Sequence, residues 1–140
     1  MSDEFYAKLR VLVVDDNKHA RKLAQRILNA LGCSDVKEAV NAEEAWSHIV
    51  SQDFHILLLD YKMEPVDGIS LAKRIRTDPA SPHPGVPIIL VTAEPSLQAM
   101  QAARAAGIDE VLPKPFSPQG LKERVEAIVK RADSAQNPHD

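Results

Sequence analysis

The sequence has little of what several classes of protein require. It contains 1 cysteine, Cys33, so an internal disulfide cannot form and a reducing compartment is favoured. No apolar run approaches the roughly 20 residues of a membrane-spanning helix, and the first residues lack the apolar core of a signal peptide. The net charge is only −3, which gives no electrostatic reason to expect nucleic acid or an anionic membrane as a partner. We therefore expect a cytoplasmic protein that binds neither.

Motifs for soft metals and reactive thiols are also missing. The 5 histidines are scattered without the spacing of a metal site. Cys33 follows Gly32 at an expected helix end, with no cationic neighbour that would activate a thiolate. We interpret it as a small structural residue.

Short apolar runs alternate along the chain with stretches of helical period. Runs that are apolar on both faces are typical of buried parallel strands, and the apolar residues between them recur at helical spacing. The predicted strands cover residues 9–14, 35–39, 56–60, 86–92 and 110–112. The predicted helices cover residues 18–31, 42–50, 68–77, 95–106 and 118–131.

This order of elements predicts one α/β domain, a doubly wound five-stranded parallel sheet between two layers of helices. We assign residues 9–132 to this domain, 1–8 to a flexible leader and 133–140 to a flexible polar tail. Residues 78–87, the proline-rich loop, contain four prolines and cannot form a helix or a central strand. No repeat or composition shift marks a second domain, so we expect no fused output domain.

Polar residues of complementary chemistry stand where four of the predicted strands end: Asp15, Asp16, Asp60, Thr92 and Lys114. In an open α/β sheet, ligands bind outside the carboxyl ends of the strands, so these side chains should share one pocket. Three neighbouring carboxylates repel one another and favour a cation, and all-oxygen ligands suit Mg²⁺. A fixed Asp60 carboxylate can attack phosphorus, while Thr92 and Lys114 can neutralise phosphoryl oxygens.

Each of these residues also has a plain structural explanation. An acidic pair after a strand often caps the following helix, and a single aspartate or lysine is usually solvated. The combination of five such residues on four strands argues against coincidence.

Four segments carry a resemblance to one known family. They are Val11–Asn17, Leu57–Met63 followed by Asp67 and Gly68, Ile89–Ala93, and Pro113–Phe116. In order and spacing they resemble the bacterial response-regulator receiver domain, the CheY-like family, over about residues 9–130. The resemblance implies a flavodoxin-like three-layer sandwich with strand order 2-1-3-4-5.

The resemblance also implies roles for the strand-end residues. Asp60 would be phosphorylated by a sensor histidine kinase or a histidine phosphotransfer protein. Asp15, Asp16, Asp60 and the backbone carbonyl of Lys62 would bind Mg²⁺ (or Mn²⁺), with Asp16 as a direct ligand and Asp15 acting partly through water.

Residues at the two remaining strand ends would interact with the phosphoryl group on Asp60. Thr92, with Ala93 beside it, would supply the switch hydroxyl, and Lys114 the counter-charge to the phosphate. The Lys114–Pro115 bond is typically cis in this family.

The sequence departs from the family pattern at three places. The family's proline directly after Met63 is displaced, so that Glu64 precedes Pro65. Val111 stands where the family often has a tyrosine or phenylalanine ring that moves during switching, which makes an aromatic relay doubtful here. The proline-rich loop is longer than in compact members.

From chemistry alone we also expect Lys62 and Glu94, which flank the pocket, to approach each other. As an exposed ion pair they would add only about 0–1 kcal/mol to stability. Their proposed role is to gate the access of water and partners to the acyl phosphate, and two solvated charges are the plain alternative.

We expect a phospho-accepting signalling switch rather than an enzyme. A haloacid dehalogenase-type hydrolase needs a second acid two residues after its nucleophile, and that position is Lys62. A flavodoxin-type cofactor site needs a phosphate loop rich in serine, threonine and glycine, but acidic residues follow the first strand. A receiver-like module that binds partners without phosphorylation remains open because of Val111.

Output would then come from docking on a downstream target or from relaying the phosphoryl group. We expect the docking surface to comprise residues 95–106, 108–112 and 117–131. The sequence leaves open whether this surface binds a target protein or a second copy of the chain. It also leaves the cognate kinase open.

Overall fold

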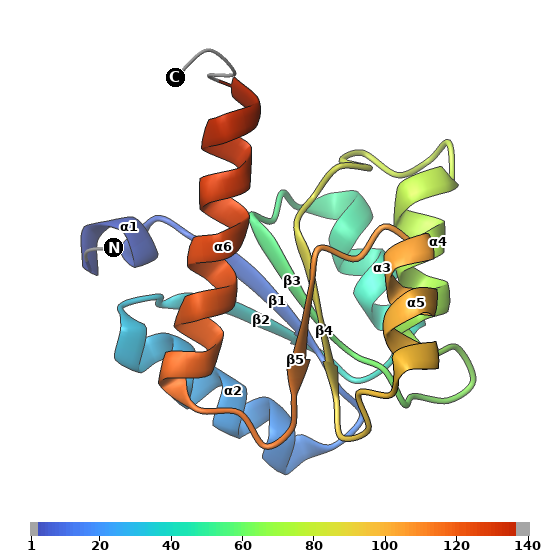
Figure 1. Cartoon of the computed structure of the whole chain (residues 1–140), viewed down its shortest axis with the longest axis horizontal. Coiled ribbons are helices and arrows are strands. Elements are labelled where there is room, and N and C mark those ends of the chain that lie inside the picture. Colours follow the sequence, from blue (N-terminus) through green and yellow to red (C-terminus); the bar gives the residue numbers. More distant parts are fainter. Residues whose placement is uncertain (1–2, 137–140) are drawn as a thin grey trace.

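The central element of the fold is a parallel sheet of five strands, in the order β2-β1-β3-β4-β5 (Figure 1). The computed structural model describes residues 3–136, with side chains described for residues 4–131. The strands are β1 (Arg10–Val14), β2 (Asp35–Ala39), β3 (Ile56–Asp60), β4 (Ile88–Thr92) and β5 (Glu110–Pro113). Every adjacent pair is parallel, which confirms the predicted fold class and strand order.

Helices cover both faces of the sheet, as the sequence predicted (Figure 1). They are α1 (Asp3–Ala7), α2 (Lys18–Leu31), α3 (Ala42–Ser51), α4 (Gly68–Thr77), α5 (Leu97–Ala105) and α6 (Pro118–Gln136). One buried cluster joins Leu57 and Leu59 of β3 to α3, α4 and α5. A second joins Ile56 and Leu58 to α1, α2 and α6. Because successive strand side chains point to opposite faces, an apolar run such as β3 serves both clusters.

Side-chain caps fix where the helices begin. Asn17 accepts a 3.0 Å hydrogen bond from the backbone N–H of Ala20 at the start of α2. Ser96 accepts a 3.1 Å bond from Ala99, so α5 begins at Leu97 rather than at the predicted residue 95. Such caps satisfy N–H groups that have no partner within the helix.

Part of the amino-terminal segment, expected to be a flexible leader at residues 1–8, is helical in the structure, and residues 1–2 lie outside the described residues. Residues 3–7 form α1, and the Tyr6 side chain is only 1% exposed. Tyr6 belongs to the cluster beneath α2 and α6, and its ring meets Phe5 edge-on at 5.2 Å between centroids. Burial of this aromatic surface orders the segment, a tertiary effect that periodicity does not reveal. At the other terminus α6 continues to Gln136, and the rest of the expected tail, residues 137–140, lies outside the described residues.

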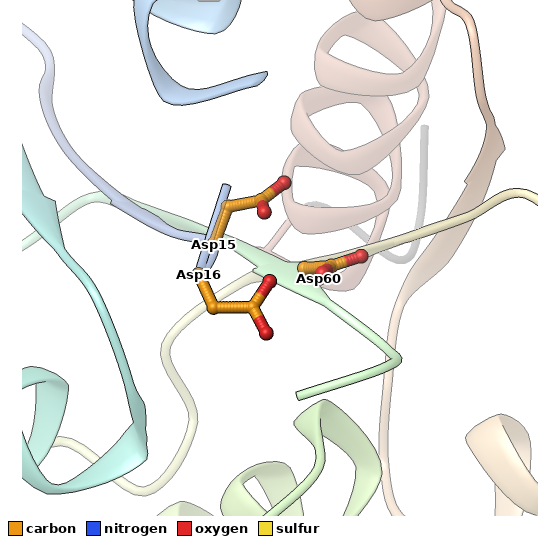
Figure 2. Close-up of side chains that lie close together, drawn as sticks. All are labelled: Asp15, Asp16 and Asp60. Carbon is orange, nitrogen blue, oxygen red and sulfur yellow. The ribbon is translucent and has the colours of Figure 1, made fainter. Parts of the chain in front are cut away.

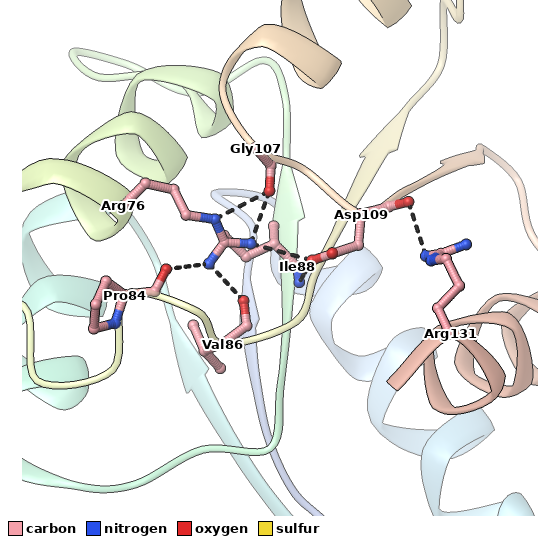
Figure 3. Close-up of polar contacts among 7 residues, drawn as sticks. All are labelled: Arg76, Pro84, Val86, Ile88, Gly107, Asp109 and Arg131. Atoms are coloured by element: carbon pink, nitrogen blue, oxygen red, sulfur yellow. Dashed lines mark hydrogen bonds and ion pairs between the residues drawn. The ribbon is translucent and has the colours of Figure 1, made fainter. Parts of the chain in front are cut away.

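The proline-rich loop is tied to the rest of the domain by Arg76 of α4 (Figure 3). Its Nη1 donates to the carbonyls of Pro84 and Val86, each at 2.7 Å. Its Nε and Nη2 donate to the carbonyl of Gly107 at 3.0 and 2.8 Å, and Nη2 also contacts Asp109 at 3.1 Å. A side chain therefore fixes a segment that lacks secondary structure of its own. Within the described residues, no helix has the length and apolarity needed to cross a membrane.

Candidate functional site

Four strands bring their polar terminal residues to one edge of the sheet. Asp60 ends β3 and Thr92 ends β4, while Asp15 follows β1 directly and Lys114 follows β5. Asp15, Asp60 and Thr92 are 5%, 6% and 1% exposed, and they are the buried polar or charged residues among those whose side chains the structure describes. The predicted convergence is seen for the carboxylates of Asp15, Asp16 and Asp60 and for Lys114, and it follows from the parallel register of the strands.

The carboxylates of Asp15, Asp16 and Asp60 face one another across this edge (Figure 2). Each offers an oxygen, and these oxygens all lie within 4.8 Å of one another. Asp15 and Asp60 are buried, whereas Asp16 is exposed. This is an open acidic site at the carboxyl ends of β1 and β3.

Lys114 bridges the two buried carboxylates. Its Nζ donates to Oδ2 of Asp15 at 2.9 Å and to Oδ1 of Asp60 at 3.0 Å. Its backbone N–H donates to the carbonyl of Thr92 at 2.8 Å, which anchors the segment after β5 to β4. The Lys114–Pro115 peptide bond is cis, as predicted.

Burial and charge shift the pKa values at this site. Burial of the Asp60 carboxyl raises its pKa from 3.8 to about 6. The hydrogen bond from Lys114 opposes this rise, and the negative charges of Asp15 and Asp16 add to it. Burial alone would lower the pKa of the Lys114 ammonium, but its hydrogen bonds to Asp15 and Asp60 raise the pKa above the ordinary value. Asp60 is therefore a carboxylate that a further positive charge would stabilise.

The donor set fits a small divalent cation. Three carboxylates with no histidine or cysteine are hard ligands, and Mg²⁺ prefers one or two carboxylates together with water. Both oxygens of Asp15 already accept hydrogen bonds, Oδ1 from the N–H of Asn17 at 2.9 Å and Oδ2 from Lys114. Among the described residues, nothing donates a hydrogen bond to the carboxylate of Asp16. Asp16 is thus the carboxylate most available to an ion.

Thr92 is the last residue of β4, and Ala93 follows it directly. The Thr92 hydroxyl accepts a 3.1 Å hydrogen bond from the backbone N–H of Glu94. Ala93 is exposed and lines an apolar cleft of about 280 Å³, together with Leu23 of α2, Phe116, and the Asp60 and Lys114 side chains. The cleft was not predicted, because its two walls are distant in sequence.

Lys62 and Glu94 flank one hollow next to the site but do not pair. The Nζ of Lys62 lies 4.9 Å from the ring centroid of Tyr61, and the described side chains include no ion pair between Lys62 and Glu94. The expected approach of these two residues is therefore not seen. Lys62 stands in the loop directly after Asp60, where its backbone carbonyl was predicted to bind the metal ion, and that role stays a prediction.

Val111, the atypical switch position, is half-buried in β5. It packs against the cluster beneath α5, and its carbonyl accepts a 3.0 Å hydrogen bond from Nε of Arg124. Its aliphatic side chain packs at this position of β5, but it has no aromatic ring that could move during switching.

Position 68 must be a glycine for a reason that hydrophobic periodicity does not reveal. A Cβ at Gly68 would lie 2.4 Å from the carbonyl oxygen of Asp60, closer than real contacts allow. The N–H of Gly68 also donates to the carbonyl of Tyr61 at 3.0 Å. The Asp67–Gly68 pair was noticed as a motif, but periodicity carries no signal for this close approach.

The chain is similar to known proteins over most of its length. The family model of the response regulator receiver domain matches residues 11–126. The chemotaxis protein CheY1 of Helicobacter pylori is 35% identical over 122 residues, which cover 86% of this chain and 97% of that protein.

Solved structures agree with this result. The receiver domain of the Francisella response regulator 1452 superposes with a TM-score of 0.78 at 30% identity, covering 89% of this chain and 99% of that one. The Vibrio cholerae chemotaxis protein CheY4 also gives a TM-score of 0.78, at 27% identity, covering 85% and 97%. From the family match, the sheet topology and the acidic site with its bridging lysine, we conclude that this chain belongs to the response regulator receiver domain family.

Proposed function

We propose that Asp60 accepts a phosphoryl group from a phosphohistidine of a sensor histidine kinase or a histidine phosphotransfer protein. An oxygen of the Asp60 carboxylate attacks phosphorus, a new O–P bond forms, and the donor's N–P bond breaks as its imidazole leaves. The observation that carries this proposal is the pair of hydrogen bonds from Lys114 to Asp15 and Asp60. They place a fixed positive charge beside the buried carboxylate that would bear the phosphoryl group.

Asp15 and Asp16 would hold Mg²⁺ or Mn²⁺ next to Asp60, with the Lys62 carbonyl as a further ligand. When bound, such an ion would neutralise charge on the phosphoryl oxygens. The protein's own contribution is to hold the Asp60 carboxylate at the end of β3, with Lys114 ready to contact a phosphoryl oxygen and the Thr92 hydroxyl ready to contact another. Burial of the Asp60 carboxylate itself would limit the access of water to it.

Mass spectrometry of the intact protein tests this proposal. Full-length protein is incubated with acetyl phosphate and MgCl₂, and then with acetyl phosphate and EDTA. The wild type should gain the mass of one phosphoryl group only with Mg²⁺, and Asp60→Asn should gain none. Glu43→Gln removes an exposed carboxylate on α3 and should behave like the wild type. Phosphorylation of Asp60→Asn, or none in the wild type, would refute the assignment.

Two alternatives give different results in the same samples. A receiver-like module that binds partners without phosphorylation would gain no mass, yet would bind its partner equally in all variants. A hydrolase would turn over p-nitrophenyl phosphate repeatedly. We propose that the chain is not an enzyme of this kind, because Lys62 occupies the position where the hydrolase needs an acid.

We further propose that phosphorylation alters docking at a surface formed by α5, β5 and α6. Leu97 and Met100 of α5 are 75% and 46% exposed, although both are apolar. Next to them, a groove of about 300 Å³ is lined by Met100, Val111 and Arg124 among others. Pull-downs with unmodified and beryllofluoride-treated protein would detect a target, and size-exclusion chromatography would detect a homodimer through this face. A Leu97→Asp variant should weaken either interaction.

A further inference from the structure

The two peptide groups that flank the Cα of Asp15 are held by two neighbouring elements. The N–H of Asp15 donates to the carbonyl of Ala39 at the end of β2, at 3.1 Å. The carbonyl of Asp15 accepts a 2.8 Å hydrogen bond from Nη1 of Arg21 on α2. The backbone from which the exposed Asp16 side chain projects is therefore fixed, although its carboxylate is free to bind an ion.

Arg21 is itself fixed against the sheet. Its Nε donates to Oε1 of Glu38 on β2 at 3.2 Å, and its side chain is only 12% exposed. Helical side chains lean toward the amino terminus of their helix, which brings the guanidinium of Arg21 back over the carbonyl of Asp15. A guanidinium can donate to two acceptors in different directions at once, whereas an ammonium is a compact point charge.

We propose that Arg21 is a positioning residue for the divalent cation. By donating to the carbonyl of Asp15, it fixes the Asp15–Asp16 peptide plane against α2 and holds the Asp16 carboxylate opposite Asp60. This inference rests on the proposed function, since it presumes that the site binds Mg²⁺. The ion demands near-ideal octahedral geometry, so a ligand whose backbone can rotate binds it less well. Groups that orient metal ligands typically change affinity by about 10–100-fold.

The positive charge of Arg21 affects Mg²⁺ affinity in the opposite direction to its positioning role. A guanidinium near the acidic cluster repels a second cation, so removal of its charge alone would tighten Mg²⁺ binding. Loss of the hydrogen bond to Asp15 would weaken it. The direction of the change therefore separates positioning from charge.

Lys22 provides a matched control. Its Nζ contacts the other oxygen of the same carboxylate, Oε2 of Glu38, at 3.2 Å, but it is 49% exposed and has no described contact with Asp15. Arg21→Gln and Lys22→Gln remove the same charge from adjacent positions. Arg21→Lys keeps the charge but loses the guanidinium group that donates to Asp15 and Glu38 at the same time.

Isothermal titration of each full-length variant with MgCl₂ gives the dissociation constants. We expect Arg21→Gln and Arg21→Lys to bind Mg²⁺ about tenfold more weakly than the wild type, within the range for orienting groups. Lys22→Gln should stay within about twofold or bind more tightly, because it loses only charge. Amide hydrogen exchange at Asp15, whose N–H donates to the carbonyl of Ala39, should be faster in both Arg21 variants and unchanged in Lys22→Gln when measured without metal.

A destabilised control separates positioning from a general loss of stability. Arg76→Lys loses contacts at the opposite end of the sheet and should bind Mg²⁺ like the wild type. Arg21→Gln affinity equal to or tighter than that of the wild type overturns the inference, as does equal weakening in Arg76→Lys. If the wild type binds Mg²⁺ and Arg21→Gln does so equally well, the inference alone fails. A wild type that binds no Mg²⁺ overturns the proposed function as well.

Discussion

Replacement of Asp60 by asparagine is expected to stabilise the metal-free protein at neutral pH. Burial raises the pKa of the Asp60 carboxyl from 3.8 to about 6, so the folded state holds this proton more tightly than the unfolded state. The stability associated with the protonated carboxyl is fully present below about pH 3.8 and is lost as the pH rises through about 6. Since one pKa unit corresponds to about 1.4 kcal/mol, ionisation of Asp60 costs about 3 kcal/mol above pH 6.

Asparagine resembles the protonated carboxyl at every pH. In EDTA at pH 7.5, Asp60→Asn should therefore be about 2–3 kcal/mol more stable than the wild type. At about 3 °C per kcal/mol for a domain of this size, the melting temperature should rise by about 6–9 °C. The gain should shrink as the pH falls from 6 and disappear near pH 4.

Urea unfolding at a series of pH values from 4 to 8 measures this difference directly. Titrating groups distant from Asp60 contribute equally to both proteins and cancel, so the difference reports Asp60 together with the charges coupled to it. Glu43→Gln, an exposed acid-to-amide change, should stay within about 0.5 kcal/mol of the wild type. Two results would contradict this reasoning: an Asp60→Asn variant no more stable than the wild type at pH 7.5, or a difference that is independent of pH. Either would show that ionisation of the buried Asp60 carboxyl does not destabilise the folded protein.

Three further predictions follow from single contacts. Gly68→Ala places a Cβ 2.4 Å from the Asp60 carbonyl and should cost about 2 kcal/mol or more of unfolding free energy in urea, whereas Gly120→Ala, with no contact closer than 3.4 Å, should be neutral or stabilising by about 0.5 kcal/mol. Arg76→Lys removes most of the hydrogen bonds to the carbonyls of Pro84, Val86 and Gly107 and should lower the unfolding free energy by about 1–3 kcal/mol; an unchanged value would contradict the role given to Arg76 in holding the proline-rich loop. Lys62→Ala should change the lifetime of the phosphorylated protein, measured by decay of the intact-mass signal, if Lys62 gates access to the acyl phosphate; an unchanged lifetime removes that role.

Much of the site could be predicted because strand-end position is a local property. The apolar runs that precede Asp15 and Asp60 each indicate a buried strand, and the aspartate indicates where that strand ends. Parallel pairing then brings all such ends to one edge. Hydrophobic periodicity alone could not show which side chains touch. The contact between Lys114 and Asp60 spans 54 residues, and the expected pairing of Lys62 with Glu94 does not occur.

The same limit explains the elements that the sequence analysis missed. Tyr6 belongs to a segment too short to show a helical stripe, and only its burial beneath α2 and α6 orders it. Arg21 looks like a solvated charge on the first turns of a helix until Glu38 and the carbonyl of Asp15 are placed beside it. The apolar cleft beside Phe116 is lined by residues far apart in the sequence, so it can be recognised only in the folded structure.

By itself the sequence determined the fold class, the strand order through its family motifs, and the identity of the residues at the carboxyl edge. These depend on local alternation of apolar and polar residues, which each segment carries with it. Only the tertiary structure decided that Lys114 bridges Asp15 and Asp60, that burial raises the pKa of Asp60, and that Arg21 donates a hydrogen bond to the carbonyl of Asp15. Those features depend on burial and on distances between segments far apart in the chain, and neither quantity is encoded in any one segment.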